Sequence, residues 1–477
     1  MNSLNNRISP KLAYHIFKTS FIKSLDNLED VINRAGMVYV CTVIFFLTST
    51  SIVFFTPPLQ VPDEYNHLVR AYQISEGIFA SPIKYVNGHK SSYGEVPISL
   101  SKLYSFKNPF DSAHSASIPF IKYTFSVPLE KDKTTIINIP NTGQYSPIPY
   151  IPQAIGAWLG MNAGLSLGGT FYLMRFMAVL FSAVCIFLSM RILSEKRLLI
   201  FLIAMMPMFL FETASISADA VTYALSILFI SYILSQCDSN LPMTREEYFL
   251  LAIIALTLGF IKQIYGVILL LYFLIPARRA QNKRRFYLIG LILISMFLAS
   301  SVFWLYMMGG SEVTHPNLSS VKPKEQISYL INNPMQYPDI ILNTITNKFE
   351  DYHNQFIGVL GWLKIILPQW FYRFYTIILI ISAVCGKLNL SIWQRAFMPI
   401  CVAISFLVIS LNLYITWTPV GKSTVDGIQG RYMIPLAMMI LVPLACRRKL
   451  KYENITACLA GLTSAVVTIL CIYDYLY

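Results

Sequence analysis

Long apolar runs, separated by short polar connections, dominate the chain from residue 38 onwards. A run of about 20 apolar residues is long enough to cross the hydrocarbon core of a bilayer as a helix. The runs predict about eleven membrane-spanning helices. Their ranges are 38–55, 169–192, 198–212, 217–236, 248–261, 264–277, 286–308, 371–386, 396–413, 431–446 and 454–473. The predicted fold class is an all-α integral membrane protein.

Three longer stretches interrupt this pattern. Residues 1–36 are polar and mildly basic, and their apolar residues recur at helical spacing. They fit either an amphipathic helix on the cytoplasmic surface or a mobile leader, before a transmembrane domain over 37–477. Residues 57–168 and 309–370 form two long, largely polar segments, and connections of this length are usually functional. Each contains a short apolar part, at 149–159 and 356–367, which we expect to touch the membrane interface.

Composition supports a membrane protein, and the distribution of charge predicts how the chain is oriented in the membrane. Hydrophobic residues make up 55% of the chain and charged residues only 13%, which excludes an ordinary soluble domain. The formal net charge of +13 comes partly from basic clusters beside the apolar runs, at 191–197, 278–285, 387–395 and 447–451. Such clusters mark cytoplasmic connections, so we expect the N-terminus inside and both long polar segments outside. The first span is then a retained signal anchor.

Several functional classes lack their sequence signals. The eight cysteines avoid the long polar segments and form no CxxC pair, so we expect neither a disulfide framework nor a zinc site. The chain has no Walker loop, and no GxGxxG motif follows a strand pattern. No basic stripe with interleaved aromatic residues indicates a nucleic-acid surface.

The most informative stretch is residues 56–67, TPPLQVPDEYNH, which begins where the first span ends. Its prolines stiffen the backbone and end the span. Asp63 and Glu64 follow directly, and adjacent acids at a membrane surface are costly unless they are paired or functional. Asp63 is either the N-cap of the next helix or a general base at the outer membrane face. Glu64 is expected to orient the site or to bind Arg70.

This stretch, followed by a long outer loop, resembles the GT-C superfamily of glycosyltransferases, multispan enzymes that take sugars from polyprenyl-phosphate carriers. The resemblance is closer to one bacterial branch, whose elements run in order across most of the chain. Tyr65 stands where a proline is common in that branch. The elements are the run from Pro62 to Gly77, YSPIPYIPQA at 145–154, SISAD at 215–219, GVLGW at 358–362 and QGRY at 429–432.

The resemblance implies a GT-C-like helical bundle that catalyses an inverting displacement. Asp63, or its neighbour Glu64, is the expected catalytic base, which deprotonates the acceptor. The expected contacts to the donor phosphate are Arg431, Lys262 and Arg70, and the expected substrate contacts are His67, Tyr150, Asp219, Trp362 and Gln429. Simpler roles stand beside these: interfacial snorkelling for the cations, a helix cap for Asp219, and an interfacial aromatic belt for Trp362. Some superfamily members use a divalent cation, but we expect no metal or other cofactor here.

The implied function is a glycosyltransferase of the bacterial inner membrane. Its donor is a sugar on undecaprenyl phosphate, and its acceptor is a surface glycan or lipid-linked glycan on the periplasmic side. An O-antigen acceptor follows by analogy with phage-type serotype-converting glucosyltransferases, which have a similar size and layout. The alternative is a transporter or flippase of a lipid-linked glycan, for which repeats and broken helices near the midplane are typical. A glycan polymerase or ligase is a third candidate.

Overall fold

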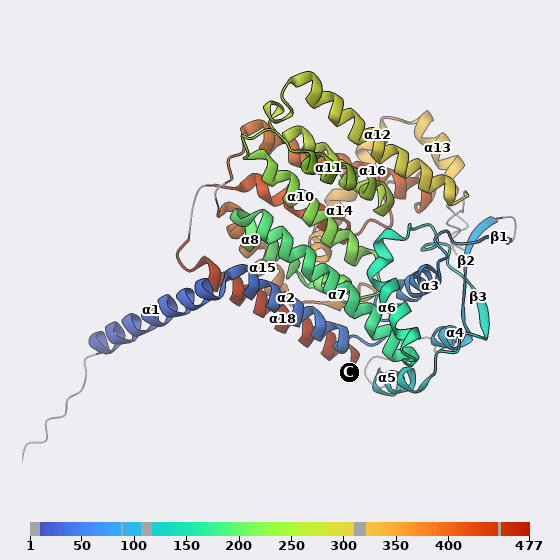
Figure 1. Cartoon of the computed structure of the whole chain (residues 1–477), viewed down its shortest axis with the longest axis horizontal. Helices are drawn as coiled ribbons and strands as arrows, with labels where there is room; N and C mark the ends of the chain where they lie inside the picture. Colours follow the sequence, from blue (N-terminus) through green and yellow to red (C-terminus); the bar gives the residue numbers. More distant parts are fainter. Residues whose placement is uncertain (1–9, 87–88, 106–116, 310–320, 387, 447–449) are drawn as a thin grey trace, which may run out of the picture.

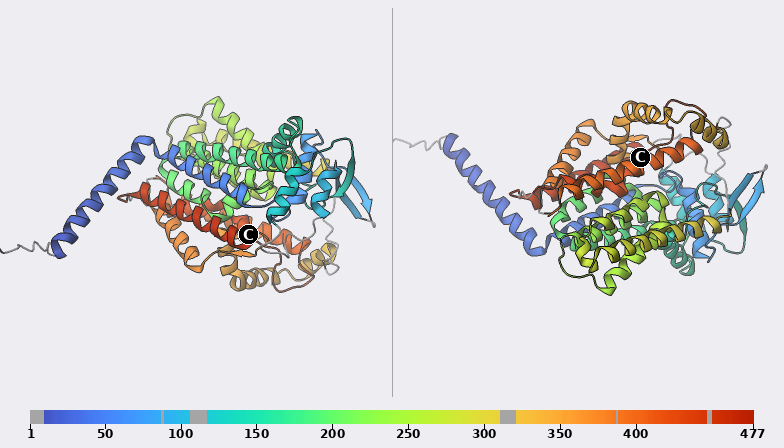
Figure 2. Two further views of the ribbon diagram at one scale, coloured as in Figure 1. Left: turned by 90° about the horizontal axis from the view of Figure 1, so that it is seen from below. Right: turned by 90° about the horizontal axis from the view of Figure 1, so that it is seen from above.

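The molecule is an elongated bundle of helices with a small sheet at one end (Figure 1). Helix α1 (Pro10–Ala35) projects from the opposite end, as both views of Figure 2 show. We call these ends the sheet end and the α1 end. The computed structural model describes residues 10–86, 89–105, 117–309, 321–386, 388–446 and 450–477. Residues 1–9, 387 and 447–449, on which parts of the leader and topology predictions rested, lie outside the described residues.

Six helices among the described residues are long and apolar enough to cross a membrane. Four of them begin at a Ser or Asn whose side chain accepts a backbone N–H, which satisfies donors left free in the first turn. The six helices confirm six of the predicted spans. They are α2 (Met37–Phe55), α7 (Leu167–Ile192), α10 (Ala218–Cys237), α12 (Lys283–Met307), α16 (Ile392–Thr416) and α18 (Glu453–Leu476).

The other five predicted spans are shorter or interrupted, so eleven spanning helices are not confirmed. Pro207 opens a second short helix in the middle of one apolar run, and Pro435 lies within a 3₁₀ segment in another, where each lacks a backbone donor. The elements are α8 (Arg197–Ala204), α9 (Pro207–Thr213), α11 (Arg245–Ile261), η3 (Gln263–Leu274), α15 (Gln369–Val384), η5 (Gly430–Leu436), α17 (Ala437–Leu441) and η6 (Val442–Leu444).

The first long polar segment is a small folded unit that contains a sheet, which an all-α fold class did not include. The antiparallel strands are β1 (Ile83–Val86), β2 (His89–Pro97) and β3 (Thr134–Asn138), in that order across the sheet. Helix α3 (Glu64–Ser75) packs against β2 so closely that a Cβ on Gly94 would lie 2.2 Å from Val69. The described part of this segment also contains α4 (Ile98–Ser105), α5 (Ser117–Ser126), η1 (Ile148–Tyr150) and a further helix, α6 (Ile151–Asn162).

Helix α6 (Ile151–Asn162) occupies the short apolar stretch for which we expected an interfacial helix. Gly156 and Gly160 face α7, where a Cβ on either would lie 2.7 Å from Met174 or Thr170. Glycines at this spacing allow helix backbones to approach closely. Helix α6 therefore packs tightly onto a candidate span and covers α3 from the other side.

The described part of the second long polar segment, from residue 321 onwards, is also mostly helical. It contains α13 (Pro323–Asn332) and α14 (Gln336–Gly358), followed by a hairpin of β4 (Val359–Leu360) and β5 (Ile365–Ile366). The C-terminal half of α14 packs against η5, where the side-chain oxygen of Gln355 accepts the N–H of Gly430 at 2.9 Å.

Connections predicted on one side of the membrane meet at one end of the bundle. At the α1 end, Lys196 donates to the carbonyl of Ala383 at 2.8 Å, and Arg395 donates to that of Ala445 at 2.6 Å. The short elements η2 (Ser194–Lys196) and η4 (Ala277–Ala280) belong to these connections.

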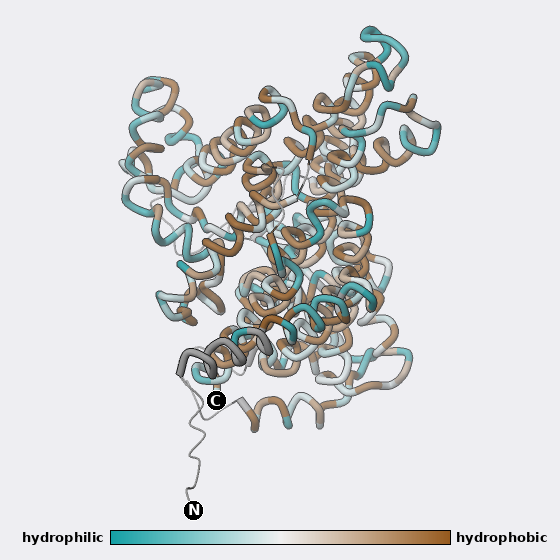
Figure 3. Tube along the Cα trace, turned by 90° about the vertical axis from the view of Figure 1, so that its left-hand side faces the viewer, coloured by the Kyte–Doolittle hydropathy of each residue, from teal (hydrophilic) through white to brown (hydrophobic). Residues whose placement is uncertain are grey.

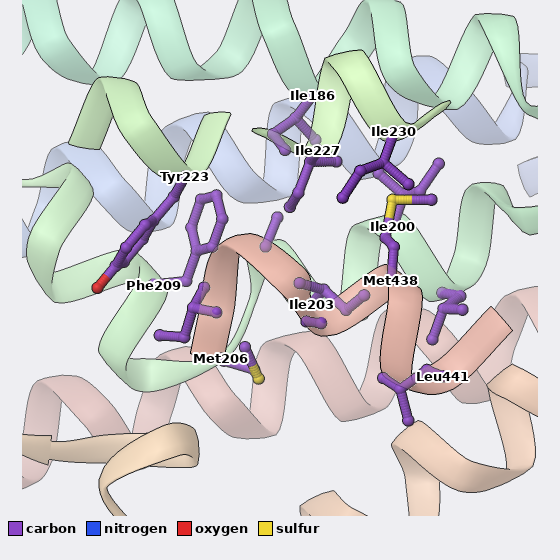
Figure 4. Close-up of a cluster of buried hydrophobic side chains, with 14 of the residues drawn as sticks. Ile186, Ile200, Ile203, Met206, Phe209, Tyr223, Ile227, Ile230, Met438 and Leu441 are labelled. Atoms are coloured by element: carbon purple, nitrogen blue, oxygen red, sulfur yellow. The ribbon is translucent and has the colours of Figure 1, made fainter. Parts of the chain in front are cut away.

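The largest of the three apolar clusters among the described residues fills the bundle between these ends. Hydrophobic residues follow most of the helical turns, with shorter hydrophilic stretches between them (Figure 3). Figure 4 shows the centre of the core, where side chains of α7 to α10 meet Met438 and Leu441 of α17. The buried polar groups described next lie at the sheet end of this core.

Candidate functional site at the sheet end

A cluster of charged and polar side chains gathers where α3, η1, α9, α10, η3 and η5 meet. We call it the sheet-end site and define it by His67, Tyr150, Glu212, Asp219, Lys262 and Arg431. Four of these six are charged, and side chains of this kind inside a membrane bundle are usually paired and functional. The resemblance named five of the six, and the structure brings those five together.

Asp219 and Lys262 form the first ion pair of the site. Asp219 lies in the first turn of α10, where Ser217 caps the helix by accepting the Asp219 N–H at 3.0 Å. The carboxylate accepts a hydrogen bond from the Lys262 ammonium at 2.5 Å. That ammonium also lies 5.3 Å from the ring centroid of Tyr145. The helix cap belongs to Ser217, so the carboxylate of Asp219 faces a cation instead.

Glu212 and Arg431 form the second ion pair. Glu212 is buried in the last turn of α9. One of its carboxylate oxygens accepts a hydrogen bond from Arg431, at the start of η5. Its other oxygen and the Arg431 Nε have no hydrogen-bond partner. Asp219 interacts electrostatically with Arg431 as well as with Lys262, so the two pairs form one group with two cations and two anions.

His67 and Tyr150 line the neighbouring wall. The His67 Nδ1 and the Tyr150 hydroxyl are 2.6 Å apart, and the His67 ring stacks on Tyr145. Burial, together with the nearby cations Lys262 and Arg431, lowers the pKa of His67 to about 3, although the Asp219 carboxylate opposes this shift. His67 is therefore neutral at physiological pH.

Asp63 lies one residue before α3, at the predicted position, but its side chain makes no helix-capping hydrogen bond. Its carboxylate accepts from the Asn141 side chain at 3.1 Å, and Asn141 in turn accepts from Asn66 at 2.8 Å. The Asp63 side chain is only partly buried.

Glu64 and Arg70 do not form the expected pair. Glu64 instead forms a fully buried ion pair with Arg175 on α7 at 2.6 Å. Arg70 donates to the backbone carbonyls of Ile78, Phe79 and Tyr145. Arg70 thus stabilises a turn of the first polar segment, and its guanidinium already has several acceptors.

Two predicted substrate contacts lie at the edge of the site. Trp362 is on the exposed tip of the β4–β5 hairpin, near Gln60. Gln429 precedes η5, two residues before Arg431, and is partly buried.

The sequence argument missed Glu212 and Arg175. Each is a charged residue within an apolar run. A charge in this position predicts a buried partner of opposite charge, and that signal was present in the sequence. Among the described residues, no group of three or more His, Cys, Asp or Glu side chains could hold a metal ion. The eight cysteines are free thiols.

This architecture defines a class: a polytopic helical membrane protein with a charged site buried at one end of its bundle. The chain belongs to the family described as predicted membrane protein (DUF2142), which matches residues 45–440. The matched region contains every residue of the sheet-end site. No curated protein and no solved structure matches the chain.

Proposed function

We propose that this protein is a glycosyltransferase that moves a sugar from undecaprenyl phosphate to a surface glycan or its lipid-linked precursor. In this proposal the protein lies in the bacterial inner membrane. The sheet end faces the periplasm, because basic residues cluster in the connections at the α1 end.

The convergence of Lys262 and Arg431 is the observation that carries the proposal. A departing polyprenyl phosphate needs positive charge held close to its oxygens. The two cations come from segments far apart in the sequence, and both interact with Asp219. Each cation is paired with a carboxylate, and the donor phosphate replaces that carboxylate when it binds.

Asp63 supplies the base in this mechanism. Its carboxylate takes the proton of the acceptor hydroxyl as the hydroxyl oxygen attacks the anomeric carbon of the sugar. The bond from that carbon to the phosphate oxygen breaks, and the phosphate leaves with the electron pair. Attack opposite the leaving group inverts the anomeric centre. Glu64 is not the base, because both of its oxygens accept hydrogen bonds from Arg175 and backbone amides.

The test measures transfer by the purified protein in lipid, supplied with radiolabelled undecaprenyl-phosphate hexoses and acceptor glycan. Asp63→Asn should insert normally and lose at least about 100-fold in rate, the usual contribution of a general base. Asp238→Asn is the control, because Asp238 is exposed and lies at the other end of α10 from Asp219. Arg431→Ala in the same assay should raise the donor KM. Transfer by Asp63→Asn at the wild-type rate would remove Asp63 from the mechanism.

The broken helices favour a second candidate, a transporter of a lipid-linked glycan. Interrupted helices with charged residues near their ends are typical of transporter binding sites. Here the apolar run at 198–212 is split, and η3 begins directly after Lys262. If wild-type protein transfers no sugar from several donors, lipid vesicles with a fluorescent lipid-linked glycan should show protein-dependent movement across the bilayer. Lys262→Met should abolish that movement.

A further inference from the structure

The backbone around Asp63 adopts an unusual conformation. Leu59 and Asp63 have φ values of 68° and 59°, in the left-handed region that L-residues rarely occupy. Only five non-glycine residues in the described part of the chain have positive φ, and two of them lie in this stretch of five residues. Such conformations persist only where the surrounding structure holds them, and they concentrate at functional sites.

Arg175 holds this stretch from the side of α7. Its guanidinium is fully buried and binds Glu64 through Nε at 2.8 Å and Nη2 at 2.6 Å. The remaining N–H groups donate to the carbonyls of Val53, Thr56 and Pro57, where α2 ends. The fixed fork of a guanidinium can join these groups, whereas a lysine ammonium cannot reach them all.

Glu64 extends the contact to two further backbone amides. One carboxylate oxygen accepts a hydrogen bond from the N–H of Leu59 at 3.0 Å. Leu59 is one of the two residues with positive φ in this stretch. The other oxygen accepts the N–H of Ile216 at 3.1 Å, in the turn before α10. The ion pair therefore joins the end of α2, the start of α3 and the start of α10.

We propose that Arg175 and Glu64 are positioning residues, whose buried ion pair sets Asp63 in register with Asp219 and its partner Lys262. Asp63 directly precedes Glu64, and Asp219 lies three residues after Ile216. The role in transfer rests on the proposed function. Neither residue touches substrate, since both side chains are fully buried.

A buried ion pair alone does not require a positioning role. Removing two charges from water is so costly that apolar residues often stabilise a fold equally well. The distinguishing feature is the set of five backbone groups that this pair binds, four of them within residues 53–59 and one at Ile216. The chain offers a matched control at the α1 end, where Arg279 is also buried and binds Glu247 at 3.0 Å.

The experiment compares Arg175→Lys and Glu64→Asp with the control Arg279→Lys, all as full-length protein in lipid. The first two variants keep both charges, so they should insert and fold, but they lose the multiple backbone contacts. Hydrogen exchange of the backbone amides should become about tenfold faster or more over 57–66 and 214–219, because the contacts that protect them are gone. The control should leave exchange in both segments unchanged.

Transfer kinetics supply the second measurement. In Arg175→Lys and Glu64→Asp, kcat should fall about 10- to 100-fold, because misplacing a base by about 1 Å has an effect of this size. The donor KM should stay within about threefold, because the phosphate contacts are intact. If Arg175→Lys and Glu64→Asp fold but keep wild-type hydrogen exchange in both segments, or keep the wild-type kcat, the proposal is overturned. If wild-type protein transfers no sugar, the proposed function fails, and faster exchange still supports a role in holding the three segments together.

Discussion

Substituting Lys262 by methionine would leave the carboxylate of Asp219 buried without the ammonium that lies 2.5 Å from it. The Asp219 and Lys262 side chains are only 8% and 13% exposed, so water cannot replace the lost partner. Removing one member of a buried pair typically costs about 3–5 kcal/mol. Arg431 also acts on Asp219 and compensates in part, so we expect the lower end, about 3 kcal/mol.

The double variant Asp219→Asn with Lys262→Met removes the stranded charge along with its partner. It should be only about 1–2 kcal/mol less stable than wild type, since the remaining loss is that of a hydrogen bond. The exposed pair of Lys422 and Asp426, with side chains 43% and 38% accessible, is the control, and its coupling should stay below about 1 kcal/mol.

The assay is a double-mutant cycle on the free energy of unfolding, measured in mixed lipid–detergent micelles at fixed composition. The two single variants and the double variant of each pair are compared with wild type. A coupling energy for Asp219 and Lys262 no larger than that of the control pair would refute the reasoning, because the site would then be as well hydrated as the surface.

Two further predictions concern pH and packing. Between about pH 6.5 and 3 the unfolded chain binds a proton at His67 that the folded chain excludes, so the free energy of unfolding should fall by about 1.4 kcal/mol per pH unit as pH decreases. His67→Gln should remove that slope in unfolding measured at pH 7.5 and 5, and an unchanged slope would contradict the burial argument. A methyl group at Gly430 would lie 1.9 Å from the carbonyl oxygen of Tyr352, so Gly430→Ala should lower stability by about 1–3 kcal/mol. Gly169→Ala, whose nearest neighbour is a side-chain atom at 3.3 Å, is its control, and equal losses in thermal unfolding would exclude the close contact as the cause.

The sequence predicted the long spans well, because a continuous apolar run has few alternatives to a membrane-spanning helix. It did not show that the run at 264–277 adopts the 3₁₀ geometry of η3. The interruption at Pro207 did have a sequence signal, the proline itself, which the predicted span at 198–212 passed over. The small sheet was also missed. Apolar and polar residues alternate only weakly along its strands, and β2 packs against α3 only in the folded protein.

The sheet-end site was also predicted only in part: the sequence identified several of its residues but not how they pair. Asp219, Lys262 and Arg431 stood out because charges near apolar runs need an explanation. Their pairing could not be read from the sequence, because the partners of Arg431 and Glu64 lie more than a hundred residues away. Glu64 was expected either to orient the site or to bind Arg70, six residues away, and Arg70 instead donates to backbone carbonyls of its own segment.

The contact between α1 and α18 has a consequence for the order of assembly. Glu29 on α1 accepts hydrogen bonds from the Asn454 side chain and the Ile455 N–H, in the first turn of α18. Helix α18 also packs along α2, yet it leaves the ribosome after every other described helix. The contacts that α1 and the flank of α2 make with α18 therefore cannot form until α18 has been synthesised and inserted.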